Sequence, residues 1–333
     1  MPFMNRSPLS WLLAAGSILL CPACSAAPTI KTSDPRSPLS LVQTIPLPDT
    51  KGRIDHLAVD VDGRRLLVAE VANGTVDVID LRAGKVVGRV SGLKEPQGVA
   101  WLPRQDEFVV ACGDGSVRFF AGRDRHEVAT VALGDDADDV RVDPRNGQVV
   151  VGYGKGGLAT INPATHKLVG RVLFRGHPEG FQLSGGRAFV NVPDDGAILA
   201  LDMERGTVAA RWSTGVHRLN FPMAIDPAGQ TITIAYRLPA AWARIDVRTG
   251  ATVAISSTCG DSDDLFAAGD SELVVCGAGH VDLVRNDRIM ARVETGGGAR
   301  TGLYVPELRE LFVAVPSRGK PAAIWALRLR HAD

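Results

Sequence analysis

The sequence predicts an all-β protein, a seven-bladed β-propeller of four-stranded antiparallel blades, and three observations carry that prediction. A turn-rich segment that runs into a short apolar strand recurs seven times, at steps of about 42 residues. A second strand, rich in Val, Ile and Phe, follows a turn in every repeat. An additional strand before the first repeat supplies the strand that the last repeat lacks.

The repeat is clearest in two aspartate-rich segments, GDDADDVRVD at 134–143 and GDSDDLFAA at 260–268. Their equivalent residues, Asp139 and Asp264, lie 264 − 139 = 125 positions apart, which is three steps of about 42. The other five repeats begin at 54–60, 96–101, 178–183, 221–226 and 300–305.

The second half of each repeat has the pattern of a β-hairpin. TVDVIDLRAGKVVGRV at 75–90 places a D-x-x-x-G turn between two apolar runs, and segments 157–172 and 197–212 follow the same plan. Such turns favour tight connections between antiparallel strands. Each repeat therefore has four strands, which is typical of a propeller blade.

The last repeat is one strand short. After the strand at 324–329 only four residues remain, too few for a fourth strand. The segment LVQTIPL at 41–47 precedes the first repeat, and its Val42 and Ile45 have the V-x-x-[VI] spacing of the fourth strands. We expect 41–47 to complete the last blade and close the ring without an open sheet edge.

The repeat motifs resemble those of a known family. LLVAEVANGTVDVIDLRAG at 66–84 looks like the YVTN-type β-propeller repeat, and residues 39–330 as a whole are similar to the YncE-like extracytoplasmic propellers. The resemblance implies a propeller in the periplasm or outside the cell, in a family most of whose members have no settled activity. The hairpins at 280–293 and 319–329 are short or irregular, so no ligand contact is carried over to them.

The N-terminal residues have the layout of a secretory signal. Arg6 precedes an apolar run at 11–20, and small residues follow it, which predicts a signal peptide over 1–27. Lipid attachment at Cys24 is the alternative. Residues 28–38 carry three prolines and polar side chains and are predicted to be a disordered spacer.

Composition narrows the class of partner. Lys plus Arg and Asp plus Glu both number 37, and no basic block occurs, so no nucleic-acid surface is expected. After residue 27 no run is long and apolar enough to cross a bilayer. We expect a monomer, periplasmic or secreted, or lipid-anchored through Cys24, whose partner is a small molecule or an envelope protein.

Three cysteines follow the predicted signal. Cys112 and Cys276 end equivalent strands of repeats two and six, too far apart to bond to each other. An oxidising compartment permits a disulfide between Cys259 and Cys276, and three small buried thiols are the alternative.

In a propeller, the loops that enter the inner strands surround one mouth of the central channel, so equivalent residues of the repeats form a ring there. At this position the chain carries acidic residues, histidines and an arginine from several repeats. The candidate ligand-binding residues are Asp55, His56, Gln97, Asp138, Asp139, His177, Glu179, Asp263, Asp264 and Arg300.

Three interpretations of this ring stay open. Asp139, Asp264 and Glu179 would hold a divalent cation such as Ca²⁺ or Mg²⁺ through oxygen ligands. Alternatively, His56 with Asp55 or Glu179 would act as a catalytic acid–base pair. In the third interpretation the carboxylates only accept hydrogen bonds from loop backbone and channel water.

These interpretations lead to two functional hypotheses of different classes. The first is an extracytoplasmic propeller that binds a small ligand or protein partner at an acidic channel mouth, without catalysis. The second is a propeller enzyme, a lyase or lactone hydrolase, that uses the cation or the acid–base pair at the same mouth. Basic loop residues on the same face, together with Arg53 and Arg300, would neutralise an acidic ligand.

Overall fold

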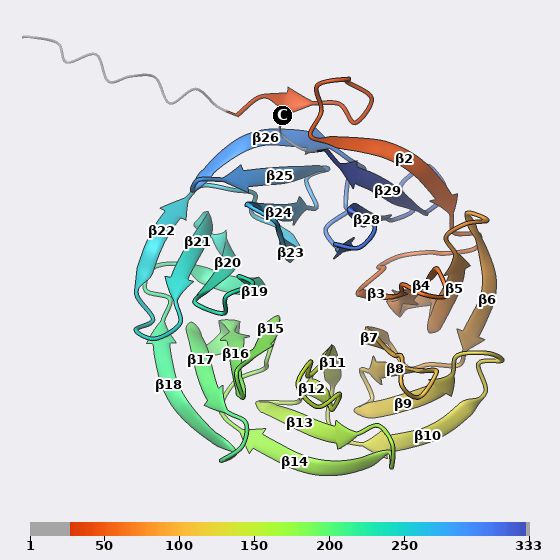
Figure 1. Ribbon diagram of the computed structural model, residues 1–333, viewed down its shortest axis with the longest axis vertical. Coiled ribbons are helices and arrows are strands. Elements are labelled where there is room, and N and C mark those ends of the chain that lie inside the picture. Colours follow the sequence, from red (N-terminus) through yellow and green to blue (C-terminus); the bar gives the residue numbers. More distant parts are fainter. Residues whose placement is uncertain (1–26, 331–333) are drawn as a thin grey trace, which may run out of the picture.

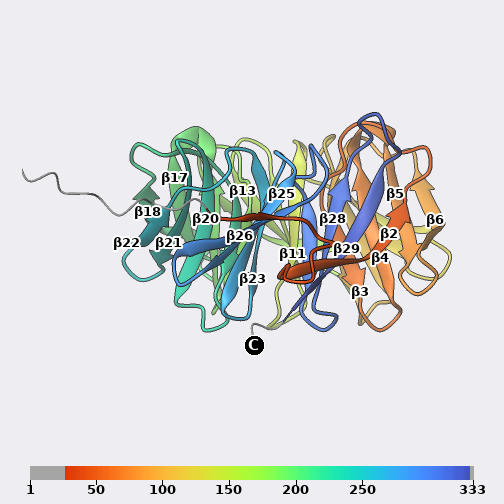
Figure 2. The ribbon, with the colours of Figure 1, turned by 90° about the horizontal axis from the view of Figure 1, so that it is seen from above.

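Seven antiparallel sheets stand around a central axis in the computed structural model, which describes residues 27–330 (Figure 1). The strands of each blade follow one another from the axis outward in Figure 1, and the side view shows that the ring is a disc (Figure 2). The predicted seven-bladed propeller is confirmed. Within the described residues, the helical segments are two short 3₁₀ turns, η1 (Val71–Asn73) and η2 (Pro193–Asp195).

The first five blades follow the chain in order, each from its inner to its outer strand. Blade 1 contains β3 (Leu57–Asp60), β4 (Arg65–Glu70), β5 (Thr75–Asp80) and β6 (Lys85–Ser91). Blade 2 contains β7 (Pro96–Leu102), β8 (Glu107–Cys112), β9 (Ser116–Ala121) and β10 (Glu127–Ala132). Blade 3 contains β11 (Ala137–Val142), β12 (Val149–Tyr153), β13 (Gly157–Asn162) and β14 (Lys167–Leu173). Blade 4 contains β15 (Phe181–Ser184), β16 (Arg187–Val192), β17 (Ala197–Asp202) and β18 (Thr207–Ser213). Blade 5 contains β19 (Arg218–Ile225), β20 (Thr231–Leu238), β21 (Ala240–Asp246) and β22 (Thr252–Ser256).

The last two blades take strands from the N-terminal part of the chain. Blade 6 contains β23 (Ser262–Ala268), β24 (Ser271–Cys276), β25 (His280–Arg285) and β26 (Arg288–Glu294). Blade 7 contains β27 (Gly302–Val305), β28 (Glu310–Val315), β29 (Ala323–Leu329) and, outermost, β2 (Leu39–Pro46). β2 pairs antiparallel with β29, from Leu39 opposite Leu329 to Pro46 opposite Ala323. The predicted ring closure is thus confirmed, with the strand beginning two residues earlier than expected.

The predicted disordered spacer at 28–38 is wrong in part. β1 (Thr29–Ile30) adds a parallel strand to the outer edge of blade 6, and the Arg292 backbone N–H donates to the Pro28 carbonyl at 2.9 Å. Ile30 also packs against the core between blades 6 and 7. Composition indicated a segment too polar to fold alone, but the open edge of β26 offers it hydrogen-bond partners. The predicted signal peptide and Cys24 lie outside the described residues.

The core lies between neighbouring blades. All six residues of β24 are buried, whereas the outer strands alternate exposed and half-buried side chains. One cluster, for example, joins Val109 and Phe119 of blade 2 to Val149 and Val151 of blade 3. Because every blade shares its faces with two others, the ring forms a rigid frame for the channel. No helix in residues 27–330 has the length and apolar character needed to span a bilayer.

Candidate ligand-binding site

A β-bulge at the start of the inner strands positions the site. In β11, Ala137 pairs with Tyr153 and Val140 pairs with Val151, so β11 carries one residue more than β12. Bulges redirect side chains that strict alternation would send to opposite faces. Asp138 and Asp139 lie in this bulge, and both line the central cavity. β7, β19 and β23 have the same irregularity at the equivalent position.

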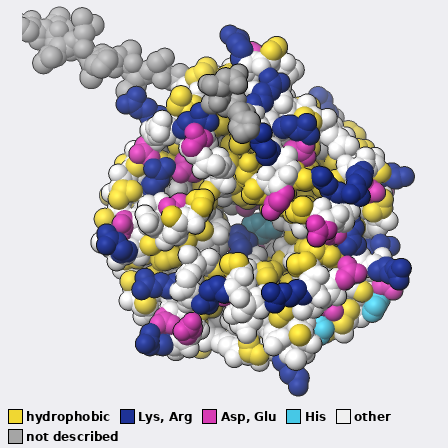
Figure 3. Space-filling model, viewed as in Figure 1, with side chains coloured by type: hydrophobic (Ala, Val, Ile, Leu, Met, Phe, Trp, Pro, Cys, Tyr) yellow, Lys and Arg dark blue, Asp and Glu magenta, His cyan; other side chains and the backbone are white. Residues whose placement is uncertain are grey.

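The cavity at the channel mouth is small and charged. Its volume is about 50 Å³, which is enough for a few water molecules. Viewed along the ring axis, the centre of the molecule is hollowed, and histidine and Lys or Arg side chains are visible within the hollow (Figure 3). The charged residues that line the cavity are Arg53, Asp55, His56, Asp138, Asp139, Arg141, Glu179, Asp263 and Asp264.

Arginines compensate three of the carboxylates directly. Asp55 pairs with Arg53, and Asp139 pairs with Arg141 two residues along the same strand. Asp263 of blade 6 contacts Arg237 of blade 5 and, at 2.5 Å, Nε of Arg300 in the loop before blade 7. The Arg237 guanidinium also stacks on Phe221, 3.8 Å from the ring centroid.

His56 links blade 1 to blade 6. Its Nδ1 lies 3.6 Å from Oδ1 of Asp264, whose Oδ2 accepts the Gly302 backbone N–H at 2.8 Å. Burial alone would lower the pKa of His56. The contact with the Asp264 carboxylate, which accepts from the imidazole, and the charges of Asp264, Asp139 and Asp55 outweigh it and raise this pKa well above its usual value. The surrounding carboxylates therefore favour the imidazolium form of His56.

His177 and Asp138 form a second pair, between blades 4 and 3. His177 Nε2 lies 3.7 Å from Oδ2 of Asp138, and Nδ1 donates to the Gly154 carbonyl at 2.7 Å. The hydrogen bond with Asp138 raises the pKa of His177 to about 9. Burial opposes ionisation of Asp138, but His177 and His56 overcome it and hold its pKa below the usual value.

Three other carboxyl groups hold protons more tightly than usual. Burial raises the pKa of Glu179 to about 8, and the neighbouring charge of Asp138 adds to the effect. Burial also raises the pKa of Asp55, to about 6, and the pKa of Asp139. Oδ2 of Asp139 is buried and finds no hydrogen-bond partner among the described residues. Near neutral pH the mouth thus presents a protonated Glu179 beside ionised neighbours.

The structure brings most of the predicted site residues together. Asp55, His56, Asp138, Asp139, Glu179, Asp263 and Asp264 line one cavity, and His177 and Arg300 contact its carboxylates.

Gln97 differs, because its amide donates to Asp136 at 2.9 Å and joins blade 2 to blade 3 instead of lining the cavity. Arg141 was missed by sequence reasoning. Its position two residues after Asp139 on one strand was the available signal, since alternate residues share a face.

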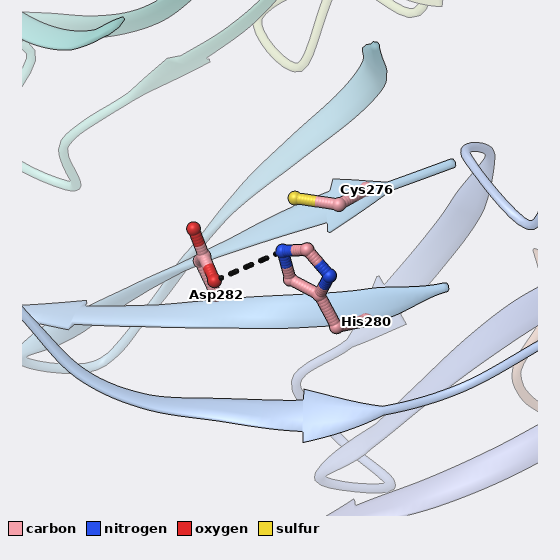
Figure 4. A group of neighbouring side chains, drawn as sticks. All are labelled: Cys276, His280 and Asp282. Atoms are coloured by element: carbon pink, nitrogen blue, oxygen red, sulfur yellow. Dashed lines mark ion pairs between the residues drawn. The ribbon is translucent and has the colours of Figure 1, made fainter. Parts of the chain in front are cut away.

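A separate cluster lies in blade 6. Cys276, His280 and Asp282 place their potential ligand atoms within 4.8 Å of one another (Figure 4). Cys276 is already bonded to Cys259 in a disulfide, and Asp282 accepts from Thr258 at 2.9 Å and Arg292 at 3.1 Å. The disulfide that the sequence left open is formed, and Cys112 is a buried free thiol. A disulfide sulfur is not a thiolate ligand, so the cluster is structural in this state.

Comparison with known proteins supports the fold. No protein-family model and no curated protein matches the chain. Among solved structures, Kuenenia stuttgartiensis hydrazine synthase superposes with a TM-score of 0.71 at 15% identity. The match covers 83% of this chain and 97% of that one. At this identity the likeness is one of β-propeller architecture.

Proposed function

We propose that this protein is an extracytoplasmic propeller that binds a small ligand at the mouth of its central channel without transforming it. The observation that carries the proposal is the convergence of charged groups there. Six carboxylates meet six cationic side chains, contributed by blades 1 and 3 to 7. Burying so many ionisable groups is unfavourable for folding alone, which favours a role in recognition. The groups are Asp55, Asp138, Asp139, Glu179, Asp263 and Asp264 with Arg53, His56, Arg141, His177, Arg237 and Arg300.

The location and family belong to the same proposal. The Cys259–Cys276 disulfide is of the kind that persists in oxidising compartments such as the periplasm or the cell exterior. The signal-like pattern at 1–27 agrees with such a location. The repeat motif at 66–84 supports membership of the YncE-like propellers.

A binding role without a resident cation fits the carboxylates best. Asp139 is paired with Arg141, and Asp264 with His56 and a backbone N–H. Glu179 retains its proton to about pH 8. A Ca²⁺ or Mg²⁺ ion needs ionised oxygen ligands around one point, whereas Asp264 uses both of its oxygens, Asp139 has only Oδ2 without a partner, and Glu179 is neutral near pH 7.

One observation favours an enzyme as the second candidate. Glu179 has a pKa of about 8 and lies close enough to Asp138 and His177 for their charges to act on it. An acid poised near neutral pH is suited to proton transfer, as a lyase or a lactone hydrolase requires.

Thermal melting with a panel of small neutral, cationic and anionic compounds tests the proposal. We expect at least one class to raise the Tm of the protein, and this rise to shrink in Glu179→Gln. Arg248→Gln, which changes an arginine side chain 83% exposed in the turn between β21 and β22, is the control and should keep the full rise. Mass spectrometry of the incubated compound then separates the candidates: unchanged compound supports binding, and a product supports the enzyme. A panel without any stabilising compound would remove the basis of the binding proposal.

A further inference from the structure

A second cavity adjoins the channel mouth on the side of blades 1, 6 and 7. Its volume is about 350 Å³, within the size range of small-molecule sites. We call it the arginine groove, defined by Arg53, Asp261, Gly277, Gly298, Arg300 and Arg318. Arg53 lines both the groove and the channel cavity, so the two spaces meet at its side chain.

The groove carries an excess of positive charge. Three arginines and one aspartate belong to its lining, a balance of 3 − 1 = 2 positive charges among the lining residues, and Asp55 and Asp263 at its edge pair with Arg53 and Arg300. Asp261 is directed at the protein, since its Oδ1 accepts the Ala278 backbone N–H at 3.2 Å. Polyvalent cations are therefore unsuited to the groove, and anions are favoured.

The three guanidinium groups retain donors for a ligand. Arg53 contacts Asp55 through one terminal nitrogen, Arg300 approaches Asp263 most closely through Nε, and a single carboxylate leaves several N–H donors of each guanidinium unused. Arg318 makes no ion pair within residues 27–330. Guanidinium groups bind carboxylate and phosphate oxygens through paired N–H donors, so these free edges match oxyanions.

Glycine shapes the floor of the groove. Gly298 has a φ of +85°, and a Cβ added there would lie 2.6 Å from Nε of Arg318. The absence of a side chain thus allows the Arg318 guanidinium to lie against the backbone. At Gly277 a Cβ would lie 2.5 Å from Oδ2 of Asp261. Because neither glycine has a side chain, the groove stays open at both positions and the side chains of Arg318 and Asp261 can lie against its wall.

Neighbouring cations already influence one another here. Burial lowers the pKa of Arg237, and the charges of Arg300 and then Arg53 lower it further, although Glu179 and Asp261 oppose them. The electrostatic repulsion among these arginines would be relieved by a bound anion, which would add to the affinity of the groove for anions.

We propose that the arginine groove binds a small organic dianion whose acidic groups are carboxylates or phosphates. Arg318 holds one acidic group, and Arg300 with Arg53 holds the other at the edge of the channel cavity. This inference rests on the proposed ligand-binding function and assigns the chemical class of the ligand.

Isothermal titration of the full chain tests it. The probes are succinate for two carboxylate groups and 2-phosphoglycolate for a phosphate beside a carboxylate, with succinamide and glycolamide as neutral counterparts at the same ionic strength. We expect one anion to bind and its neutral counterpart not to bind. Whichever of the two binds more tightly identifies the acidic group that the groove prefers.

Variants locate the binding. Arg318→Gln and Arg300→Gln should each weaken the affinity for the anion roughly tenfold, the effect of losing one charge-assisted contact. Gly298→Ala should weaken it as well, because it displaces Arg318 without changing the charge of the protein. Arg248→Gln removes an exposed charge far from the groove and should leave the affinity unchanged.

Three results would overturn the inference. Equal weakening by Arg248→Gln and Arg318→Gln would show that general charge attraction causes the binding. A neutral or cationic ligand whose affinity depends on Glu179 and not on Arg318 would refute the anion class while the proposed ligand-binding function stands. Failure of every probe in both the titration and the melting panel would refute both.

Discussion

Blades 3 and 6 begin their inner strands with the same pair of aspartates, and the two pairs have different surroundings. In blade 3, Asp139 pairs with Arg141 of its own strand and leaves a buried oxygen without a partner. In blade 6, Asp264 uses both oxygens, on His56 of blade 1 and on the Gly302 backbone of blade 7. Asp139 is paired within its own strand, whereas Asp264 connects blade 6 to blades 1 and 7.

The difference follows from the residues around each pair. Position 141 is an arginine, whereas the equivalent position in blade 6 is Phe266, which offers no charge. Asp264 must therefore take its partners from neighbouring blades, and His56 and Gly302 supply them.

Blade 6 is also anchored more firmly than blade 3. A disulfide joins Cys259, just before the inner strand, to Cys276 at the end of the second strand. The corresponding positions in blade 3, counted from the paired aspartates and the strand register, are Gly134 and Tyr153. Blade 6 thus serves as a structural junction, and blade 3 presents a partly unsatisfied acid to the channel.

Removing the carboxylate of Asp264 should have the largest effect on stability. Asp264→Ala leaves the His56 imidazolium and the Gly302 N–H without their acceptor, and we expect a loss of roughly 3 kcal/mol in the free energy of unfolding. Urea denaturation measures it. Asp264→Asn, which retains an acceptor for Gly302, should lose less. If Asp139→Ala proves as costly as Asp264→Ala, the proposed difference between the two blades does not exist.

The acid next to the blade 3 pair should make stability depend on pH. Glu179 has a pKa of about 8 in the folded protein against 4.5 as the ordinary value, so the folded state holds this proton more tightly. Its contribution to stability is complete below pH 4.5 and is lost as the pH rises to about 8. Glu179→Gln should therefore flatten the decline of the unfolding free energy between pH 5 and 8, by at most about 1.4 kcal/mol per pH unit.

Denaturation of both proteins at several pH values measures this difference. The raised pKa of His177 adds a decline of its own between pH 6.5 and about 9, and it remains in the variant. Glu204→Gln, at an exposed side chain, serves as the control and should follow the wild-type curve. Parallel curves for wild type and Glu179→Gln would mean that Glu179 ionises normally.

The fold could be predicted from the sequence because the repeat pattern occurs in every blade. Turn chemistry and apolar spacing recur seven times, and the strand at 41–47 was identified by its similarity to the other fourth strands. The ring of candidate residues followed from that alignment. Gln97 shows the limit of this alignment. Equivalent positions share a place in the backbone, but the direction of the side chain depends on the bulge and on its partner in the neighbouring blade.

The arginine partners of the carboxylates could not be predicted from the aligned ring of repeat-equivalent residues alone. The mouth was expected to be acidic because Arg141 and Arg237 lie on strand positions outside the aligned ring, and Asp263, the partner of Arg237, comes from another blade. β1 eluded prediction for a related reason, since its pairing depends on the edge of β26, which lies far along the chain. Long-range contacts of this kind leave no local pattern.

The smallest effect should come from Asp139→Asn. Burial already raises the pKa of Asp139, and its Oδ2 has no partner, so neutralising it removes an unfavourable buried charge while it weakens the pair with the half-buried Arg141. These effects oppose each other, and we expect the unfolding free energy to change by less than about 1 kcal/mol. His56 offers a second readout, because Asp139 helps to keep it protonated and its pKa, measured by NMR, should fall in Asp139→Asn. The fall should be larger in Asp264→Asn, whose carboxylate contacts the imidazole directly. The reverse order would place the anchoring acid of His56 in blade 3 instead of blade 6.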